Sequence, residues 1–392
     1  MGLDTAAARR PATPGDRGDP RDRGDPRDRG DPRDRGDPRD REDPRDRGGP
    51  QDPRDRGGPA QPLLAVTGLR KHFPLAGGLL GRPQGWVQAV DGVDFAIAKG
   101  ETLGIVGESG CGKSTTARLL MHLIAPDAGQ VVFDGEEVGA MRGLSVRDLR
   151  RQMQMVFQDS HASLNPRLTI EDSIAFGRKA AGMPVPEARD RARTMLGLVG
   201  LTPGQFAQRY PHELSGGQRQ RVNIARALAM EPRLLILDES VSALDKSVEA
   251  QVLNLLQDLK ARLALTYIFI SHDLNVVQYM SDRVLVMYLG KPVEIGTVAE
   301  IYERPRHPYT EALLSSRPSL DPRRRRSVPP LSGDPPNPIN PPSGCRFRTR
   351  CPLAEPVCAG REPLLAAAGP DAPHPVACHA RQPGSGHTRA AA

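Results

Sequence analysis

Gly107-Glu-Ser-Gly-Cys-Gly-Lys113-Ser114 decides the fold, because it fits the pattern G-x-x-x-x-G-K-[ST] of a phosphate-binding loop. The compact apolar run Thr102–Val106 before it is typical of a buried strand, and residues 115–123 after it have helical spacing. The glycines let the backbone curl so that successive N–H groups face phosphate oxygens, and the following helix adds the positive end of its dipole. We therefore expect a strand, a phosphate loop and a helix that together hold a nucleoside triphosphate.

The residues of the loop differ in what they would contribute to the ligand. Lys113 would place its charge on the β- and γ-phosphates, and the Ser114 hydroxyl would be a ligand of Mg²⁺. The nucleotide-binding residues expected from the loop are Gly107, Glu108, Ser109, Gly110, Cys111, Gly112, Lys113, Ser114 and Thr115. The loop alone does not identify the reaction, because kinases, GTPases and helicases share it.

Further along the chain, short apolar runs alternate with helical patterns. The runs at 234–237 and 267–270 are almost continuously apolar, as in strands that are covered on both faces, and 248–263 between them has helical periodicity. Residues 63–69 and 87–97 are further strand candidates. Strands that alternate with helices predict an α/β domain built on a mainly parallel sheet.

Composition argues against several other kinds of protein. The 392 residues carry a net charge of +7, but the run of four arginines at 323–326 lies in Pro-rich sequence typical of a solvated linker, so we expect no nucleic-acid partner. No window approaches the roughly 18 apolar residues that a membrane-spanning helix needs. The N-terminus carries no apolar stretch of the kind found in a signal peptide, so we expect a cytoplasmic protein.

The N-terminal region differs from the rest of the chain in its composition and in its repeats. Residues 16–47 repeat Asp-Arg-Gly-Asp-Pro-Arg with one Glu substitution, and a decayed copy continues to Pro59. A repeat of charges, Gly and Pro cannot bury enough apolar surface to offset the loss of chain entropy. We therefore predict that residues 1–60 are a disordered tail.

Two motifs after the phosphate loop narrow the class of enzyme. Leu214-Ser-Gly-Gly-Gln218 precedes a helical pattern, so that Ser215 and the glycines stand at a helix N-terminus, either as a cap or as a second phosphate cradle. Leu234-Leu-Ile-Leu is a buried strand that ends in Asp238 and Glu239, at the sheet edge where ligands bind.

Together with the phosphate loop, these motifs resemble those of ATP-binding cassette (ABC) ATPases, and they occur in that family's order. The resemblance extends to four more positions: Gln158 in Val156-Phe-Gln-Asp, Asp245 in Ser242-Ala-Leu-Asp, His272 in Ile270-Ser-His-Asp, and Phe73 in Leu69-Arg-Lys-His-Phe. It implies an ABC cassette fold and ATP hydrolysis with Mg²⁺. It also implies a dimer in which each ATP contacts the phosphate loop of one subunit and Ser215 of the other.

The resemblance assigns a role to each matching residue. Glu239 would polarise the attacking water, His272 would contact the γ-phosphate and Gln158 would sense metal and nucleotide. Asp238, with Ser114 and Gln158, would hold Mg²⁺. The remaining nucleotide contacts would come from Ser215, Gly217, Gln218 and Asp245, and from Phe73, which would stack on adenine unless it is a core residue.

Other segments are similar to a narrower group, the oligopeptide/dipeptide and nickel importers. They are Ala162-Ser-Leu-Asn-Pro-Arg, His307-Pro-Tyr-Thr-Glu-Ala-Leu-Leu and Gly344-Cys-Arg-Phe-Arg-Thr-Arg-Cys-Pro. Glu239-Ser-Val-Ser-Ala-Leu-Asp-Lys-Ser-Val and Met287-Tyr-Leu-Gly suggest the F-type of that group's two ATPase subunits. This resemblance implies uptake of di- or oligopeptides, with nickel as the alternative. A non-transport ABC ATPase is a weaker alternative, since such proteins usually carry two cassettes or a coiled coil.

The subfamily also implies partners and a location. We expect a second ATPase subunit, in a heterodimer, and two integral membrane permease subunits. A substrate-binding protein outside the membrane would take part indirectly. The chain would then be peripheral, at the cytoplasmic face of the cell membrane.

Four cysteines near the C-terminus form a separate cluster, with intervals of five, six and nineteen residues: Cys345, Cys351, Cys358 and Cys378. Four thiolates can hold a [4Fe–4S] cluster or Zn²⁺, although the spacing lacks the short C-x₂-C pairs of zinc ribbons. Some members of the resembled subfamily are thought to bind an iron–sulfur cluster there. Metal-free thiols are the third interpretation, and His374 and His379 are either further ligands or bystanders.

The predicted domain organisation follows from these segments. Residues 1–60 form the tail, 61–303 the ATPase domain with a helical subdomain at about 159–230, 304–380 an extension that carries the cysteines, and 381–392 a second disordered tail.

Overall fold

The computed structural model describes residues 61–75, 77, 84–159, 162–317, 333–367 and 374–390. The predicted tail at 1–60 and the arginine run at 323–326 lie outside these residues. Among the described residues, no helix combines the length and the apolar character needed to cross a bilayer.

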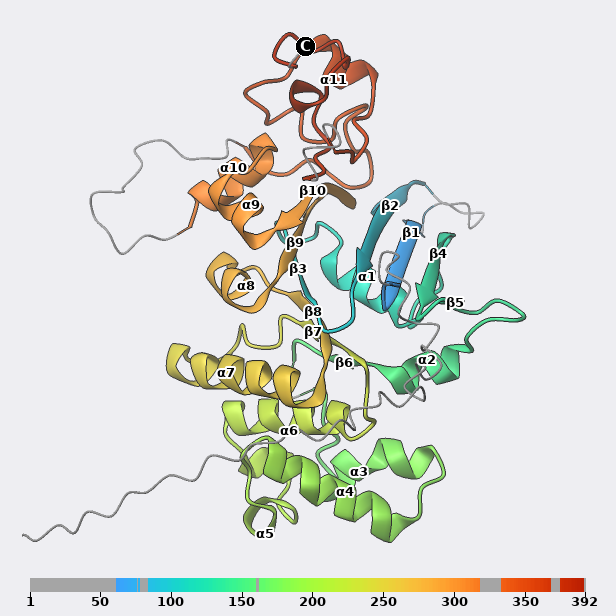
Figure 1. The fold of residues 1–392 in the computed structure, drawn as a ribbon, viewed down its shortest axis with the longest axis vertical. Coiled ribbons are helices and arrows are strands. Elements are labelled where there is room, and N and C mark those ends of the chain that lie inside the picture. The colour runs from blue at the N-terminus through green and yellow to red at the C-terminus, as the bar shows by residue number, and fades with distance from the viewer. Residues whose placement is uncertain are drawn as a thin grey trace, which may run out of the picture. The chain divides into compact units, whose positions relative to one another are not determined.

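A mainly parallel sheet forms the centre of the fold, as the sequence predicts (Figure 1). Its strands are β10 (Lys291–Thr297), β9 (Arg283–Tyr288), β3 (Thr102–Val106), β8 (Thr266–Ile270), β7 (Leu234–Asp238) and β6 (Met153–Val156), in that spatial order. All neighbours are parallel except the edge strand β10, which pairs with β9 in the antiparallel sense. The carboxyl ends of β3, β6, β7 and β8 therefore lie along one edge, where ligands bind in sheets of this kind.

Both faces of this sheet are covered, which explains the continuous apolar runs. Along β7, Leu234 and Ile236 belong to one hydrophobic cluster, whereas Leu235 and Leu237 belong to the other. Successive side chains on a strand point to opposite faces, so a strand covered on both sides has no polar face. Residues 234–237 are fully buried as a result.

A second sheet, which the sequence analysis did not predict as a separate layer, is antiparallel. It has the order β2 (Trp86–Ile97), β1 (Leu64–Pro74), β4 (Ala128–Phe133) and β5 (Glu136–Glu137). The first two strands match the predicted strand candidates, but their pairing is interrupted by register shifts near Gly68. These irregularities break the alternation of apolar and polar residues that would have indicated an antiparallel sheet.

Helices lie around the two sheets, and a further group of helices forms another part of the fold (Figure 1). Around the parallel sheet are α1 (Lys113–Leu120), α2 (Val146–Gln152), α7 (Lys246–Leu263) and α8 (Leu274–Met280). The helical part predicted at about 159–230 contains α3 (Ile170–Ala180), α4 (Val185–Leu198), α5 (Pro203–Phe206), the short 3₁₀ helix η2 (Pro211–Glu213) and α6 (Gly216–Leu228). Within it, α3 packs against both α4 and α6.

Among the described residues after β10, the regular structure consists mainly of four short helices: α9 (Val298–Glu303), α10 (Pro308–Ser315), α11 (Pro356–Gly360) and the 3₁₀ helix η4 (His379–Arg381). The fully buried Glu294 of β10 anchors it by accepting hydrogen bonds from the N–H groups of Arg306 and His307. Residues 382–390, which fall within the tail predicted to be disordered at 381–392, are among the described residues. His387 is buried there, with a ring nitrogen 2.8 Å from the Leu353 carbonyl oxygen.

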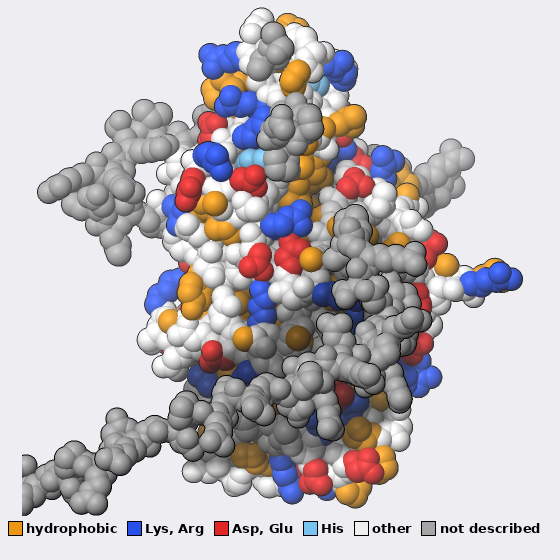
Figure 2. Space-filling model, viewed as in Figure 1, with side chains coloured by type: hydrophobic (Ala, Val, Ile, Leu, Met, Phe, Trp, Pro, Cys, Tyr) orange, Lys and Arg blue, Asp and Glu red, His pale blue; other side chains and the backbone are white. Residues whose placement is uncertain are grey.

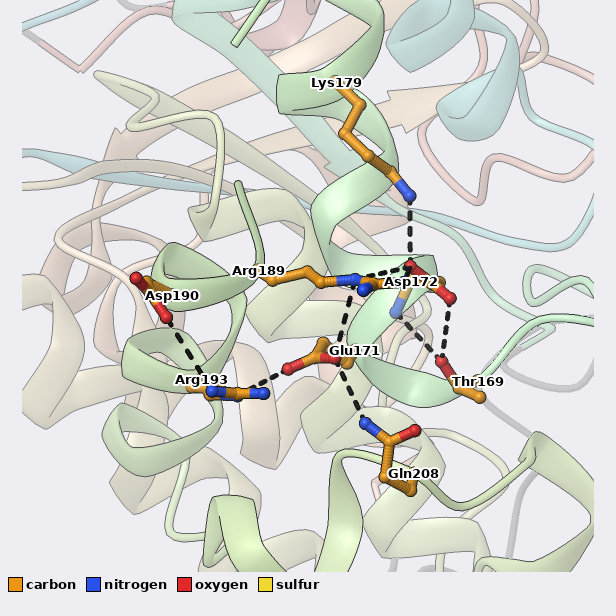
Figure 3. A network of polar contacts seen from close by, with 8 residues as sticks. All are labelled: Thr169, Glu171, Asp172, Lys179, Arg189, Asp190, Arg193 and Gln208. Atoms are coloured by element: carbon orange, nitrogen blue, oxygen red, sulfur yellow. Dashed lines mark hydrogen bonds and ion pairs between the residues drawn. The ribbon is translucent and has the colours of Figure 1, made fainter. Parts of the chain in front are cut away.

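A buried carboxylate ties the helical part together (Figure 3). The side chain of Glu171, at the start of α3, is only 3% exposed. It accepts hydrogen bonds from Arg193 of α4 at 2.6 Å and from Gln208 at 3.2 Å. Next to it, Asp172 accepts from Lys179 and from Arg189 of α4, which joins the two helices a second time.

Replacing Glu171 with Ala should lower the free energy of unfolding by about 1–3 kcal/mol, because Arg193 and Gln208 lose a buried acceptor while the half-exposed arginine can still reach water. Urea denaturation of the native chain and of the Glu171→Ala variant would measure this change in the free energy of unfolding. Asp190→Ala is the matched control, since that carboxylate is 78% exposed and lies 3.8 Å from Arg193. It should change stability by less than about 0.5 kcal/mol, and an equal effect of both variants would contradict the assignment.

Candidate nucleotide-binding site

The phosphate loop joins β3 to α1 and lies against the backbone of two other segments. A Cβ atom on Gly107 would come 2.2 Å from the Met287 carbonyl oxygen, and one on Gly112 would come 2.3 Å from that of Ala89. Both glycines also have positive φ, at 153° and 107°. A side chain at either position is therefore excluded both by close approach and by backbone conformation.

Lys113 is buried at the start of α1 and is held by the loop itself. Its Nζ donates to the Gly107 carbonyl oxygen at 2.8 Å and to that of Glu108 at 3.1 Å. The predicted phosphate-binding cation thus lies inside the curl of the loop, beside the N-terminal N–H groups of α1. Cys111 is buried in the same loop and is not exposed to solvent, and burial raises the pKa of its thiol.

Ser114 and Asp238 come together from α1 and β7 although they are far apart in the sequence. The Ser114 hydroxyl donates to Asp238 Oδ1 at 2.9 Å. Burial is the main cause that raises the pKa of Asp238, with the neighbouring Glu239 adding to it. A buried carboxylate beside a hydroxyl is an oxygen donor set of the kind that Mg²⁺ prefers, so these residues fit the predicted metal.

Gln158, Glu239 and His272 meet at one oxygen atom. The Gln158 amide donates to Glu239 Oε2 at 2.8 Å, and His272 Nδ1 lies 3.6 Å from the same atom. Glu239 directly follows β7 with a left-handed φ of 46°, and its N–H donates to the Ile270 carbonyl oxygen of β8. This uncommon conformation, fixed by the neighbouring strand, aims the carboxylate at the other two side chains.

Ser215 caps α6 in the structure. Its hydroxyl accepts from the Gln218 N–H, while the Gln218 side chain accepts from the Ser215 N–H, which makes a reciprocal capping box. A Cβ atom on Gly217 would meet the Val248 side chain of α7 at 2.4 Å, so glycine is needed there as well. Asp245 is the N-cap residue of α7. These predicted contacts therefore stand at two helix N-termini, in a part of the fold distinct from β3 and α1 (Figure 1).

Phe73 lies near the end of β1, where it pairs with Val87 of β2. Its side chain is partly exposed and does not belong to either hydrophobic cluster, and Lys71 Nζ lies 5.7 Å from the centre of its ring. The structure thus does not place it in the core, which was the alternative to a stacking role.

Two residues that sequence reasoning missed also contact the phosphate loop. Arg350 binds the Glu108 carboxylate, and the Tyr309 hydroxyl accepts from the Glu108 N–H at 2.9 Å. Arg350 is separated from Glu108 by 242 residues. No local pattern could have revealed that contact, although both residues stand in segments that the sequence analysis singled out.

The four C-terminal cysteines line one small cavity together with His379 and His387. Burial raises the pKa of the Cys345 thiol to about 12 and that of Cys378 to about 11. Within the described ranges, no group of three or more His, Cys, Asp or Glu side chains is arranged to hold a metal ion. The structure thus brings the four cysteines to one cavity without showing the predicted iron–sulfur or zinc site. His374 instead lies 2.9 Å from a Glu294 carboxylate oxygen.

Acidic and basic side chains are interspersed on the face shown in Figure 2, which shows no continuous basic patch among the coloured residues.

Known proteins share both the cassette and the C-terminal extension. Residues 90–242 match the ABC transporter family, and residues 293–358 match the C-terminal region of oligopeptide/dipeptide transporters. The dimeric ATP-binding cassette MJ0796, in a post-hydrolysis state with ADP and Pi, is similar with a TM-score of 0.52 and 28% identity, over 60% of this chain and 99% of that one. CbiO1 of Clostridium perfringens, part of the ABC transporter complex CbiONQ, has a TM-score of 0.53 and 29% identity, with 62% and 91% covered.

Curated relatives are more similar still. The chain is 50% identical to the oligopeptide transport ATP-binding protein AppF of Bacillus subtilis, over 81% of this chain and 97% of AppF. It is also 50% identical to the oligopeptide transport ATP-binding protein OppF of Salmonella typhimurium, over 77% of this chain and 92% of OppF. Similarity at this level over nearly the whole length of both relatives, together with the matching C-terminal region, shows that the chain belongs to the ATP-binding subunits of the oligopeptide/dipeptide ABC transporter family.

Proposed function

We propose that the chain is the ATP-hydrolysing motor subunit of a peptide importer and that the residues gathered at the edge of the parallel sheet carry out hydrolysis. ATP binding and ATPase activity follow from family membership. The observation that carries the residue assignment is the meeting of Gln158 and His272 at Glu239 Oε2, close to the Ser114–Asp238 pair.

The geometry supports a specific division of roles. Glu239 would hold and polarise the attacking water, with its carboxylate oriented by the amide of Gln158. His272 would contact the γ-phosphate, since its exposed ring stands beside the same carboxylate. Lys113 and the N–H groups of α1 would bind the β- and γ-phosphates. Ser114, Asp238 and Gln158 would hold Mg²⁺, which when bound neutralises phosphate charge.

A second ATPase subunit would complete the site. Ser215 and Gln218 cap the N-terminus of α6, and Asp245 is the N-cap residue of α7. A helix N-terminus of this kind attracts anions. We therefore assign these residues to the ATP of a partner subunit, in a heterodimer as the subfamily resemblance implies.

A groove beside Gln158 is suited to the permease. It has a volume of about 700 Å³, and its lining includes Gln158, Arg118 and the aromatic side chains of Phe157 and Phe176. Phe157 is 37% exposed and Phe176 is 61% exposed, so the groove presents two aromatic side chains to solvent. We assign this groove, which lies between the sheet edge and the helical subdomain at about 159–230, to a cytoplasmic segment of one of two permease subunits. The chain would then be peripheral at the inner face of the membrane.

Glu239→Gln should bind ATP but lose at least about 100-fold in hydrolysis, because the amide cannot accept a proton from the attacking water. It should also trap an ATP-bound dimer. ATPase rates and size-exclusion chromatography with ATP measure both effects, and Lys113→Ala, which should not bind ATP, is the reference. Normal turnover by Glu239→Gln would refute the role given to this carboxylate.

Transport can be tested in cells that lack this chain. Uptake of labelled di- and oligopeptides should fall, and the native chain but not Glu239→Gln should restore it. Nickel uptake is the control for cargo. A fall in nickel uptake alone would refute peptides as the cargo, and unchanged uptake of both would refute import as the role of this subunit.

We also propose that the four cysteines bind a [4Fe–4S] cluster, with zinc and free thiols as the alternatives. The proposal is supported by their common cavity. Among the described residues no group of three or more ligands is arranged to hold a metal ion, so binding would require the thiols to rearrange. Protein purified without oxygen should contain about four iron atoms per chain, and Cys345→Ser should lower that content. Iron-free native protein would contradict the cluster, and stoichiometric zinc would favour the alternative metal.

A further inference from the structure

The C-terminal extension makes a direct ionic contact with the phosphate loop. Arg350 holds the Glu108 carboxylate with two parallel hydrogen bonds, of 2.9 Å from Nη1 to Oε2 and 3.1 Å from Nη2 to Oε1. The Arg350 side chain is 6% exposed and that of Glu108 is 22% exposed. Paired contacts of this geometry between largely buried groups are stronger than ordinary surface ion pairs.

Aromatic residues fix the position of this contact. The Tyr309 hydroxyl accepts from the Glu108 N–H, and the Tyr309 ring lies 4.7 Å from that of Tyr288. Phe347 packs against both tyrosines, with ring centres 5.3 and 5.5 Å away. Arg350 also reaches the Tyr288 hydroxyl at 3.4 Å. The guanidinium thus has a second contact in addition to that with Glu108.

A second arginine of the extension supports the loop from another side. Arg346 donates to the Leu289 carbonyl oxygen and forms an ion pair with Asp91. Gly290, which follows Leu289 in the chain, donates its N–H to the Cys111 carbonyl oxygen of the loop at 2.9 Å. The extension therefore contacts the loop directly at Glu108 and indirectly at Cys111.

Charge explains why the contact with Glu108 matters. Glu108 is the acidic residue of the loop 107–114, and Lys113 Nζ donates to its carbonyl oxygen. A triphosphate that enters this loop brings several negative charges close to that carboxylate. At such distances, in a partly buried site, an unpaired carboxylate would repel the ligand. A guanidinium, which stays protonated at neutral pH, cancels this repulsion.

We propose that Arg350 is a positioning residue for ATP binding: it neutralises Glu108 and fixes the start of the phosphate loop, so that the C-terminal extension sets the affinity of the site for nucleotide. This inference rests on the proposed nucleotide site. It concerns binding rather than the hydrolytic step, because Arg350 holds Glu108, a residue of the loop that receives the phosphates.

The test uses the full chain in the assembled transporter and measures kcat and KM for ATP. Arg350→Ala should raise KM on the order of tenfold and change kcat much less, since a buried charge loses its partner next to the ligand. Arg348→Ala is the matched control. That arginine lies two residues earlier and bonds Ser343, so its removal should leave KM unchanged.

A double variant separates charge neutralisation from structural support. Glu108→Gln combined with Arg350→Ala removes the carboxylate along with its partner and should bring KM back to within about threefold of the native value. Arg350→Lys, which keeps the charge without the two-pronged contact, should give an intermediate KM. The lysine variant also keeps the test informative if the alanine variant fails to fold.

The proposal is overturned if KM of Arg350→Ala equals that of Arg348→Ala, or if the double variant binds ATP as weakly as Arg350→Ala does. The second result would mean that Arg350 only supports the fold. Failure of the nucleotide site itself would look different, because Lys113→Ala would then retain native ATP binding.

Discussion

The close approach of the phosphate loop to neighbouring backbone is the constraint on which the rest of the site depends. Gly107 and Gly112 touch the carbonyl oxygens of Met287 and Ala89, so the loop is fixed between β9 and β2 at the end of β3. With the loop fixed, α1 starts at a defined place, and Ser114 reaches the carboxylate of Asp238 across the sheet edge. The antiparallel sheet is therefore part of the site, although none of the predicted catalytic residues comes from it.

Much of this arrangement could be predicted from the sequence because it is encoded locally. The buried strands are short apolar runs, and the phosphate loop and the segment Asp238-Glu239 are read directly from neighbouring residues. The rule that ligands bind at the carboxyl ends of parallel strands then predicts that these segments meet. What that rule cannot give is the atom at which they meet. The shared contact at Glu239 Oε2 depends on the left-handed φ of Glu239 and on its hydrogen bond to β8.

Other features depend on contacts between distant residues or on irregular backbone, and these were missed or mistaken. The register shifts near Gly68 hide the antiparallel sheet, because bulges move apolar residues out of strict alternation. Residues 382–390 are mostly polar, and no local pattern indicates that His387 is buried with a ring nitrogen beside the Leu353 carbonyl oxygen. The four cysteines illustrate what clustering in sequence can and cannot predict. It correctly indicates that they share one cavity, but the arrangement of the thiols that a metal would need depends on side-chain positions that no local pattern gives.

The C-terminal extension and the edge of the parallel sheet supply contacts to different parts of the nucleotide site. Gln158, Glu239 and His272 come from the ends of β6, β7 and β8 and converge where water would be activated. Arg350 and Tyr309 come from the C-terminal part and converge on Glu108, the second residue of the phosphate loop. A change in the extension would therefore act on the loop that admits ATP, while leaving the geometry around Glu239 as the strands set it. In the arrangement that we propose, nucleotide affinity can be tuned separately from the rate of hydrolysis, because Arg350 contacts Glu108 whereas Gln158 and His272 contact Glu239.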